Sequence, residues 1–275
     1  DSNFAEILQT GAAGTQSIDA SSITITGGAG GPDNFARIRN DGTGAQTITG
    51  SPVITITGGT GGLLDHGNFA QIRAAGPQII SAGATTLTAG ASGFNNFATI
   101  QSPNQDITVD GDLTLTGGGS ISGLASGAAA RIGGFGGGIP TPTNLMLVVD
   151  SNVTMNGGTE VNAGAVIGSN FTGGQRTDIA MDVTGNVTLN TGTVANSSAR
   201  IGSPNTNIAG GDISITTGGN ITLANSPVVG TRSVIRTLDS LTLDANNITV
   251  GGSLISGAQT ITAAGDITVA APNAV

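Results

Sequence analysis

Asn68-Phe69-Ala70-Gln71-Ile72 is one of four closely related segments in the first hundred residues of the chain. The others begin at Asn3, Asn34 and Asn96, and more divergent copies continue the pattern as far as Ile235. The isoleucines that close these segments lie 28 to 35 residues apart, at Ile7, Ile38, Ile72, Ile100, Ile132, Ile167, Ile201 and Ile235. Recurrence of one motif at a nearly constant interval is typical of a repeat protein whose units stack on one another.

Each unit also contains a segment in which apolar residues alternate with threonine, such as Ile54-Thr55-Ile56-Thr57 before Gly58-Gly59. A third short apolar segment lies between the other two, around Ile18, Ile48, Ile79 and Ile107. Alternation with a period of two predicts strands that have one face in the core and one face in solvent. The sequence therefore predicts three short strands per repeat, joined by turns rich in glycine, asparagine and aspartate.

These patterns predict an all-β fold, a right-handed parallel β-helix (β-solenoid) with about eight or more coils, mostly of 31–35 residues. The segments 247–250 and 266–269 lie only 19 residues apart, so we expect narrower coils at the C-terminal end. No segment has the 3.6-residue period of a capped helix. A sandwich of antiparallel hairpins is the structural alternative, but it does not require a motif to recur. We treat residues 1–275 as a single domain, with Asn-Phe-Ala repeats in 1–127 and degenerate repeats in 128–275.

Equivalent residues of successive coils stack ~4.8 Å apart in a β-helix. We therefore expect a buried core stack made of Phe4, Phe35, Phe69, Phe97, Ile7, Ile38, Ile72 and Ile100. We also expect an asparagine ladder beside it, made of Asn3, Asn34, Asn68 and Asn96. In stacked β-structures, ladders of like residues satisfy their amides with one another.

Composition excludes several classes of function. The chain has 47 glycines, 9% charged residues, a net charge of −9 and no cysteine. Its few arginines look scattered along the sequence, and nucleic acid is not an expected partner because phosphate binding needs clustered basic residues. The absence of cysteine excludes a disulfide scaffold and a thiolate metal site. The chain has no lysine, which excludes a nucleotide P-loop, and no apolar run approaches the ~18 residues of a transmembrane segment.

Gly211-Asp212-Ile213-Ser214-Ile215, Gly219-Asn220-Ile221-Thr222-Leu223 and Ala264-Gly265-Asp266-Ile267-Thr268-Val269 resemble the passenger repeats of filamentous-haemagglutinin-like exoproteins. The resemblance covers roughly residues 100–275, and the Asn-Phe-Ala units are less typical of it. Such proteins are large bacterial surface adhesins that use two-partner or autotransporter secretion. The resemblance implies an extracellular or cell-surface β-helical shaft for adhesion, biofilm matrix or filament building. It supplies no catalytic residues, and we expect no enzymatic activity.

Candidate chemical sites are sparse. Polysaccharide-cleaving β-helices need paired carboxylates, and Asp110 and Asp112 are the tightest pair, although they flank a turn glycine. His66, the single histidine, is expected in a surface loop rather than in a catalytic triad. We expect no cofactor. Calcium remains open, with Asp41, Asp110 and Asp112 as weak candidate ligands because calcium takes six to eight oxygens. Polysaccharide binding or cleavage stays an alternative function.

Ice binding is the other alternative function. Pairs such as Thr24/Thr26, Thr55/Thr57, Thr86/Thr88 and Thr114/Thr116 would form Thr-x-Thr rows on a flat face. The row is expected to break at Asn156, Asn190 and Asp244. Six Asn-x-Ser/Thr sequons also occur, and four of them begin an apolar–threonine strand: Asn152, Asn186, Asn220 and Asn247. Because the repeat itself generates these four, glycosylation is not expected.

Both ends of the sequence look like interior repeats. The first unit begins at Asn3-Phe4-Ala5, and the last strand-like segment is Ile267-Thr268-Val269. Solenoid proteins normally cover their open ends with caps, and no amphipathic capping helix is evident. We therefore expect either end-to-end stacking of copies of the chain or continuation into a longer chain. A cell-surface or carbohydrate ligand is a further expected partner.

Overall fold

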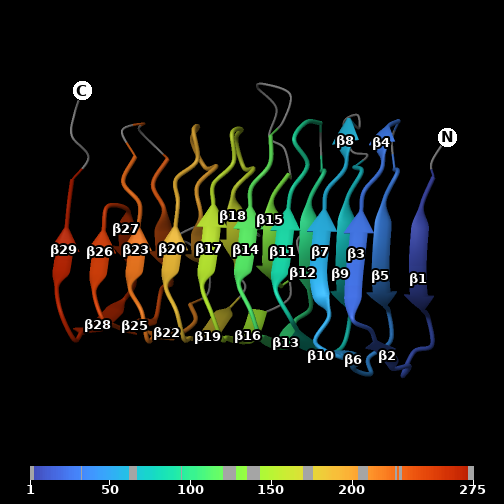
Figure 1. The fold of residues 1–275 in the computed structure, drawn as a ribbon, viewed down its shortest axis with the longest axis horizontal. Coiled ribbons are helices and arrows are strands. Elements are labelled where there is room, and N and C mark those ends of the chain that lie inside the picture. Colours follow the sequence, from blue (N-terminus) through green and yellow to red (C-terminus); the bar gives the residue numbers. More distant parts are fainter. Residues whose placement is uncertain are drawn as a thin grey trace.

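The computed structural model describes residues 3–31, 33–61, 67–93, 95–119, 128–134, 143–169, 176–203, 210–226, 228 and 231–271. In these residues the chain winds into stacked coils, each contributing one strand to each of three nine-stranded sheets. All neighbouring strands in the sheets are parallel, and equivalent residues pair from coil to coil. Figure 1 shows the coils side by side, with the two chain ends at opposite ends of the stack. The predicted β-solenoid is confirmed.

The strands fall into three sheets, which we name by their order within a coil. Sheet A contains β1 (Ala5–Gln9), β5 (Ala36–Asn40), β9 (Ala70–Ala74), β12 (Ala98–Gln101), β15 (Ala130–Gly133), β18 (Ala165–Ile167), β21 (Arg200–Gly202), β24 (Val234–Arg236) and β27 (Ser253–Ile255). Sheet B contains β2 (Gln16–Asp19), β6 (Gln46–Thr49), β10 (Gln78–Ala82), β13 (Asn104–Val109), β16 (Thr143–Val149), β19 (Thr177–Val183), β22 (Ile213–Thr217), β25 (Ser240–Ala245) and β28 (Ala258–Ala263). Sheet C contains β3 (Ser22–Thr26), β7 (Val53–Thr57), β11 (Thr85–Thr88), β14 (Leu113–Thr116), β17 (Val153–Asn156), β20 (Val187–Leu189), β23 (Ile221–Leu223), β26 (Ile248–Val250) and β29 (Ile267–Val269). Two further short strands, β4 (Ala29–Gly30) and β8 (Thr60–Gly61), pair beside the first coils.

The coil is right-handed. In Figure 1 the strands of sheet C rise on the near side, the strands of sheet A descend behind them, and the chain advances from right to left. This is the usual hand of parallel crossovers between twisted strands. A coil takes about 31 residues on average. The coil that leads from Ile235 to its partner Leu254 takes only 19, which agrees with the expected narrowing.

The core forms because each strand alternates apolar and polar residues. In β7, Ile54 and Ile56 are fully buried, while Thr55 and Thr57 lie on the outer side. One continuous apolar cluster runs from Ile23 to Ile248 along the inside of the coils. The glycine pair that follows β7 allows a tight corner, because a Cβ at Gly58 would lie 2.2 Å from the backbone oxygen of Asn96.

The predicted core stack is half wrong. Ile38, Ile72 and Ile100 are buried as expected, but the four phenylalanines lie outside the coil and Phe4 is 64% exposed. The period of two explains the error. Ala36 and Ile38 face the core, so Phe35 and Arg37 must face outward. The same rule corrects the strand around Ile79, which is exposed, because Ile80 pairs with Ile48 and is the buried residue.

Secondary structure in the described part of the chain consists of strands and turns, without helix. Among those residues, accordingly, no helix is long and apolar enough to cross a membrane.

Candidate functional site

The Asn-Phe-Ala motifs form one corner of the first four coils, just before sheet A. The backbone N–H of Asn3 donates to Oδ1 of Asn34 at 2.9 Å. The N–H of Asn34 donates to Asn68 Oδ1 at 2.8 Å, and that of Asn68 to Asn96 Oδ1 at 2.7 Å. Each asparagine therefore holds the main chain of the preceding coil, and the motif fixes coil-to-coil register.

The side-chain amides of this ladder do not pair with one another, which corrects the expected amide-to-amide ladder. They turn toward main-chain carbonyl groups in and beside the short strands β4 and β8 instead. Asn34 Nδ2 donates to Gly31 O at 3.0 Å, Asn68 Nδ2 to Thr60 O at 2.8 Å, and Asn96 Nδ2 to Gly61 O at 2.7 Å. Each asparagine thus binds two backbone segments, because its carbonyl oxygen and its amide nitrogen point to different coils or loops.

The four phenylalanine rings form a second column on the outer side of this corner. Successive ring centroids are 5.2, 4.8 and 4.6 Å apart, and the planes differ by 11°, 2° and 14°. The guanidinium of Arg37 lies 4.5 Å from the centroid of the Phe35 ring. Stacking covers each ring by its neighbours although the column faces outward.

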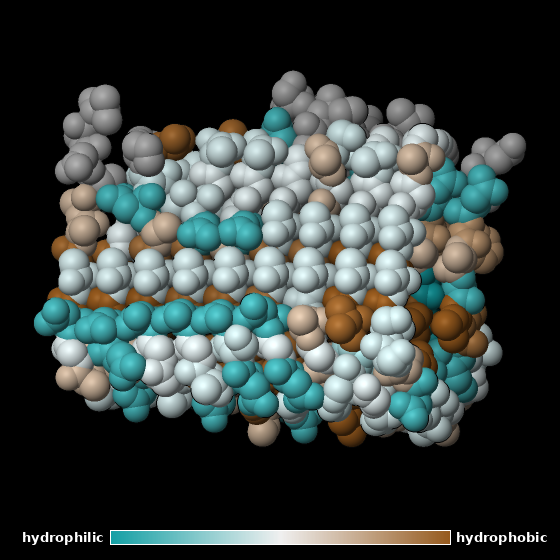
Figure 2. All heavy atoms as spheres, in the orientation of Figure 1, coloured by the Kyte–Doolittle hydropathy of each residue, from teal (hydrophilic) through white to brown (hydrophobic). Residues whose placement is uncertain are grey.

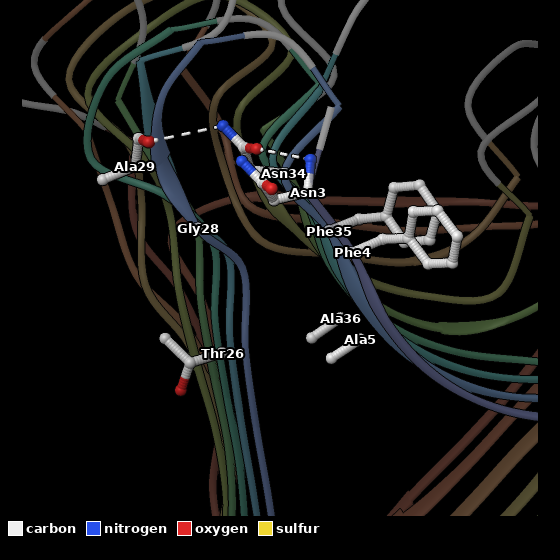
Figure 3. A pocket seen from close by; sticks show the side chains of 9 residues that line it. All are labelled: Asn3, Phe4, Ala5, Thr26, Gly28, Ala29, Asn34, Phe35 and Ala36. Atoms are coloured by element: carbon white, nitrogen blue, oxygen red, sulfur yellow. Dashed lines mark hydrogen bonds between the residues drawn. The ribbon is translucent and has the colours of Figure 1, made fainter. Parts of the chain in front are cut away.

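The N-terminal end of the two columns is open. A hollow of about 390 Å³ is lined there by the first two Asn-Phe-Ala motifs together with Thr26, Gly28 and Ala29. In Figure 3, Asn3 and Asn34 lie one behind the other, and the ring of Phe4 covers that of Phe35. No described residue donates a hydrogen bond to Asn3 Oδ1, the atom that accepts the preceding N–H in the other coils. The hollow therefore lies at the N-terminal end of both described columns.

A glutamine ladder inside sheet B accompanies the same four coils, and the sequence reasoning missed it. Gln46 Nε2 donates to Gln16 Oε1 at 2.6 Å, Gln78 Nε2 to Gln46 Oε1 at 2.6 Å, and Gln105 Nε2 to Gln78 Oε1 at 2.7 Å. All four side chains are buried. The signal was present, because each glutamine stands two residues before an inward isoleucine, as Gln46 does before Ile48.

A different ladder marks the later coils, at the corner that precedes sheet C. Its members are Asp112, Asn152, Asn186, Asn220, Asn247 and Asp266. Backbone N–H groups donate to the side-chain oxygen of the preceding member over 2.8–3.0 Å, except that Asn247 donates through its side chain. Four of these residues are the sequons noted above, so stacking accounts for the asparagine in each.

The outer face of sheet C carries a complete row of threonines. The register pairs Thr24, Thr55, Thr86, Thr114, Thr154, Thr188, Thr222, Thr249 and Thr268 in order. Figure 2 looks onto this face and shows the unbroken row, with hydrophilic residues beside it over the later coils. A parallel row from Thr26 to Thr116 changes to asparagine at Asn156, as expected. The expected break at Asp244 is wrong, because β25 belongs to sheet B.

The calcium candidates do not converge. Asp41 follows sheet A and accepts from Arg39, whereas Asp110 follows sheet B and accepts from Ser51 Oγ at 2.7 Å. Asp112 Oδ1 accepts from Ser151 Oγ at 2.5 Å and from the Asn152 N–H at 3.0 Å. Those hydrogen bonds lower the pKa of Asp112, that from Ser151 most.

Within the described ranges, His, Cys, Asp and Glu side chains form no group of three that could hold a metal ion. His66 lies outside the residues that the structure describes. Among the described residues, the recurring side-chain contacts are columns and ladders that bind one coil to the next.

Comparison of the chain with known protein families, curated proteins and solved structures finds no match. The resemblance to filamentous-haemagglutinin-like exoproteins therefore stays a prediction from the repeat pattern.

Proposed function

We propose that this chain is a segment of an extracellular structural shaft, belonging to a bacterial surface adhesin or matrix filament, which is extended by coils added to its ends. The observation that carries the proposal is the pair of asparagine and phenylalanine columns, which bind each of the first four coils to the next. Ile7, which is equivalent to the buried Ile38, is 57% exposed in the first coil. A further coil would cover this apolar surface and supply the missing N–H donor to Asn3 Oδ1.

The residues at the N-terminal end of the stack determine which kind of coil fits there. A coil that fits needs an asparagine N–H above Asn3 and a phenylalanine ring above Phe4. The described coils at the opposite end carry neither an Asn-Phe pair nor a comparable ring. The preferred occupant is therefore another Asn-Phe-Ala coil, either from a longer chain or from another repeat protein with that motif. Stacking of the C-terminal coil of a second copy would bury isoleucine but leave both columns vacant.

A coil-addition experiment tests this proposal. A second copy of residues 34–67 is placed directly before Asn3, and its control carries Asn34→Ala and Phe35→Ala in the added copy. We expect the added coil to resist proteolysis and to raise Tm by more than the control coil does. Equal protease sensitivity and equal Tm for the two variants would overturn the role of the vacant columns.

A second experiment addresses the shaft itself. Electron microscopy and light scattering at low and high protein concentration should show elongated particles whose long axis is the stacking axis. Globular particles, or association only through the lateral faces, would contradict an end-extended shaft.

Ice binding remains a second candidate because the threonine row on sheet C is unbroken over nine coils. The row spaces its hydroxyls by ~4.8 Å on a regular sheet. Only the first four coils add the second threonine of each pair, which is why this function ranks below the shaft. Thermal hysteresis that disappears in Thr154→Lys, but not in Thr242→Lys on sheet B, would favour ice binding.

A further inference from the structure

Asn156 is the only asparagine in the sequence that is followed by glycine. It ends β17, at the point where the second threonine row of sheet C changes to asparagine. Glycine has no side chain, so its backbone nitrogen can approach the preceding side chain without steric hindrance. Attack of that nitrogen on Cγ of the asparagine closes a five-membered succinimide ring. Whether the folded chain permits this reaction depends on the hydrogen bonds of the atoms concerned.

The nucleophile of this reaction is the backbone nitrogen of Gly157, whose N–H has no hydrogen-bond acceptor among the described residues. The equivalent N–H groups of the four preceding coils donate to carbonyl groups of the following coil over 2.8–3.0 Å: Gly27 to Thr57, Gly58 to Thr88, Ala89 to Thr116 and Gly117 to Asn156. Gly157 differs because β20 ends at Leu189, so strand pairing with the next coil stops at Met155. The nitrogen of Gly157 can therefore react without first breaking a hydrogen bond.

The electrophile is the side-chain carbonyl group of Asn156, which has a hydrogen-bond donor on its oxygen. Asn190 Nδ2 donates to Asn156 Oδ1 at 2.8 Å. This oxygen gains negative charge when the nitrogen attacks Cγ, and a donor held in that position stabilises the charge. Asn156 Nδ2, the leaving group, donates to Thr116 Oγ1 at 3.3 Å, and the hydroxyl can rotate to donate a proton in return. Asn156 is partly exposed, so water reaches the group.

Asn190 occupies the equivalent corner one coil later and lacks both features. The residue that follows it is Thr191, whose branched side chain crowds the backbone nitrogen. Its Oδ1 accepts no hydrogen bond from a described residue, because the next position in the row is Ala224, which has no side-chain amide. The same row therefore contains an asparagine that is arranged for the reaction and one that is not.

We propose that Asn156 and Gly157 form a self-modification site, at which the asparagine loses ammonia in the folded chain. The Gly157 nitrogen gives its proton to hydroxide and bonds to Cγ of Asn156. The bond between Cγ and Nδ2 then breaks, and the nitrogen takes up a proton from Thr116 or water and leaves as ammonia. Water opens the ring. Addition at Cγ gives aspartate, and addition at the main-chain carbonyl carbon gives isoaspartate, so water is the only co-reactant consumed.

The two products differ in their effect on the coil. The aspartate keeps the hydrogen bond from Asn190 as a charge-assisted one and adds a negative charge to the outer face of sheet C. The isoaspartate lengthens the main chain by one carbon at a corner where Gly158 N donates to Ser197 O at 2.6 Å. Aspartate therefore preserves the contact between coils, whereas isoaspartate displaces it. The site is independent of the proposed shaft function, because it lies on the side of the coils.

Peptide mass spectrometry of the intact protein, sampled during incubation in mildly alkaline buffer, tests the site. A parallel sample is unfolded in urea. We expect the folded protein to convert Asn156 to aspartate and isoaspartate while Asn190 stays an amide. If Asn156 stays an amide in the folded protein while the unfolded chain reacts, the fold protects the residue and the proposal is overturned.

Two variants test the part played by the hydrogen-bond donor. Asn190→Ala should slow the conversion of Asn156 about 2- to 10-fold, the effect of one hydrogen bond at a partly exposed site. Asn186→Ala, at the other end of β20, is the matched control and should react at the rate of the wild type. Unfolding would free the chain and speed the reaction, so a slower rate in Asn190→Ala cannot arise from lost stability. Equal rates in Asn190→Ala and the wild type contradict the assigned site.

Discussion

The first four coils and the later coils have the same three sheets but connect their coils at different places. Within sheet B, the register position of the buried glutamine ladder continues as Leu145, Ile179, Ile213 and Leu241. The interior of the N-terminal coils is therefore partly polar, whereas that of the later coils is apolar at the same position from Leu145 to Leu241, before Gln259 in the last coil. The later coils place their amide ladder outside instead, at the corner that precedes sheet C.

The internal glutamine ladder and the outer asparagine ladder specify the register of neighbouring coils in different ways. A slip of one coil by one residue would turn its glutamine outward and leave the buried amides of the adjoining coils without their partner, so an internal ladder penalises misalignment strongly. An apolar row also resists a slip, because the slip would expose leucine and isoleucine. Apolar side chains, however, distinguish the correct pairing of two coils from an incorrect one less sharply than hydrogen-bonded amides do. The outer asparagine ladder supplies that discrimination in the later coils without burying polar groups.

Among changes to the ladders and columns, breaking the glutamine ladder should have the largest effect on stability. Gln78→Leu leaves Gln46 Oε1 and Gln105 Nε2 without their buried partner. Since each orphaned buried group costs about 1–3 kcal/mol, we expect a loss of about 2–4 kcal/mol in the free energy of unfolding, measured by urea denaturation.

Replacing the whole ladder tests whether its amides do more than satisfy one another. Changing Gln16, Gln46, Gln78 and Gln105 together to leucine should cost far less than Gln78→Leu alone, because no amide is then orphaned. A fourfold variant less stable than the single variant would show that the ladder contributes more than mutual satisfaction of its amides.

Truncating the phenylalanine column should have the next largest effect on stability. Phe69 lies on the outer side and is only partly buried, so Phe69→Ala should cost about 1–2 kcal/mol, less than the ~3–5 kcal/mol of a buried phenylalanine. Ile72→Ala in the same motif should cost about 2–5 kcal/mol because Ile72 is fully buried. Thermal unfolding of both variants would reveal the order, and a larger loss for Phe69→Ala would mean that the rings face the core.

The two asparagine ladders should respond unequally to the same substitution. Asn68→Ala removes a buried acceptor from the Asn34 N–H and should cost about 1–3 kcal/mol. Asn186→Ala acts at an exposed corner where water can replace the lost acceptor, so we expect about 0.5 kcal/mol. Similar losses in chemical denaturation would remove the proposed distinction between inner and outer ladders.

The smallest expected effect is a pH dependence of stability that arises from Asp112 in the later ladder. Hydrogen bonds from Ser151 and Asn152 lower the pKa of Asp112 below its ordinary value of 3.8. The carboxylate therefore contributes stability above that value, and the contribution is lost as pH falls through the lowered pKa. Asp112→Asn should flatten the acid limb of a Tm–pH curve, whereas Asn68→Ala should leave its slope unchanged. An unchanged slope in Asp112→Asn would contradict the assignment.

The sequence was sufficient to predict the coil, because the isoleucine of each repeat recurs at the spacing that stacking requires. It also contained the side-chain directions. If Ile38 points inward, the period of two turns Phe35, Arg37 and Arg39 outward, and the same parity places Gln46 inward with Ile48. Hydrophobicity alone places phenylalanine inside and glutamine outside, whereas the alternation along each strand places these phenylalanines outside and these glutamines inside.

Other features depend on backbone paths that the repeat does not determine. Gly31, which follows β4, and Thr60, in β8, present carbonyl groups to the asparagine amides, so the amide nitrogens of Asn34 and Asn68 donate to the main chain rather than to another asparagine of the ladder. The vacancy beside Phe4 likewise depends on how the first two coils stack. Loop carbonyls have no sequence signature, which is why the hydrogen bonds of the amides could not be predicted.

The end of the glutamine ladder has a mechanical consequence. Gln105 Oε1 is a buried acceptor with no partner among the described residues, because the next side chain in its row is Leu145. When a solenoid is pulled along its axis, every coil-to-coil interface carries the same tension in series, and the weakest one yields first. The unpaired acceptor lowers the tension that the interface between β13 and β16 can carry, and this interface is the boundary between the Asn-Phe-Ala coils and the later coils.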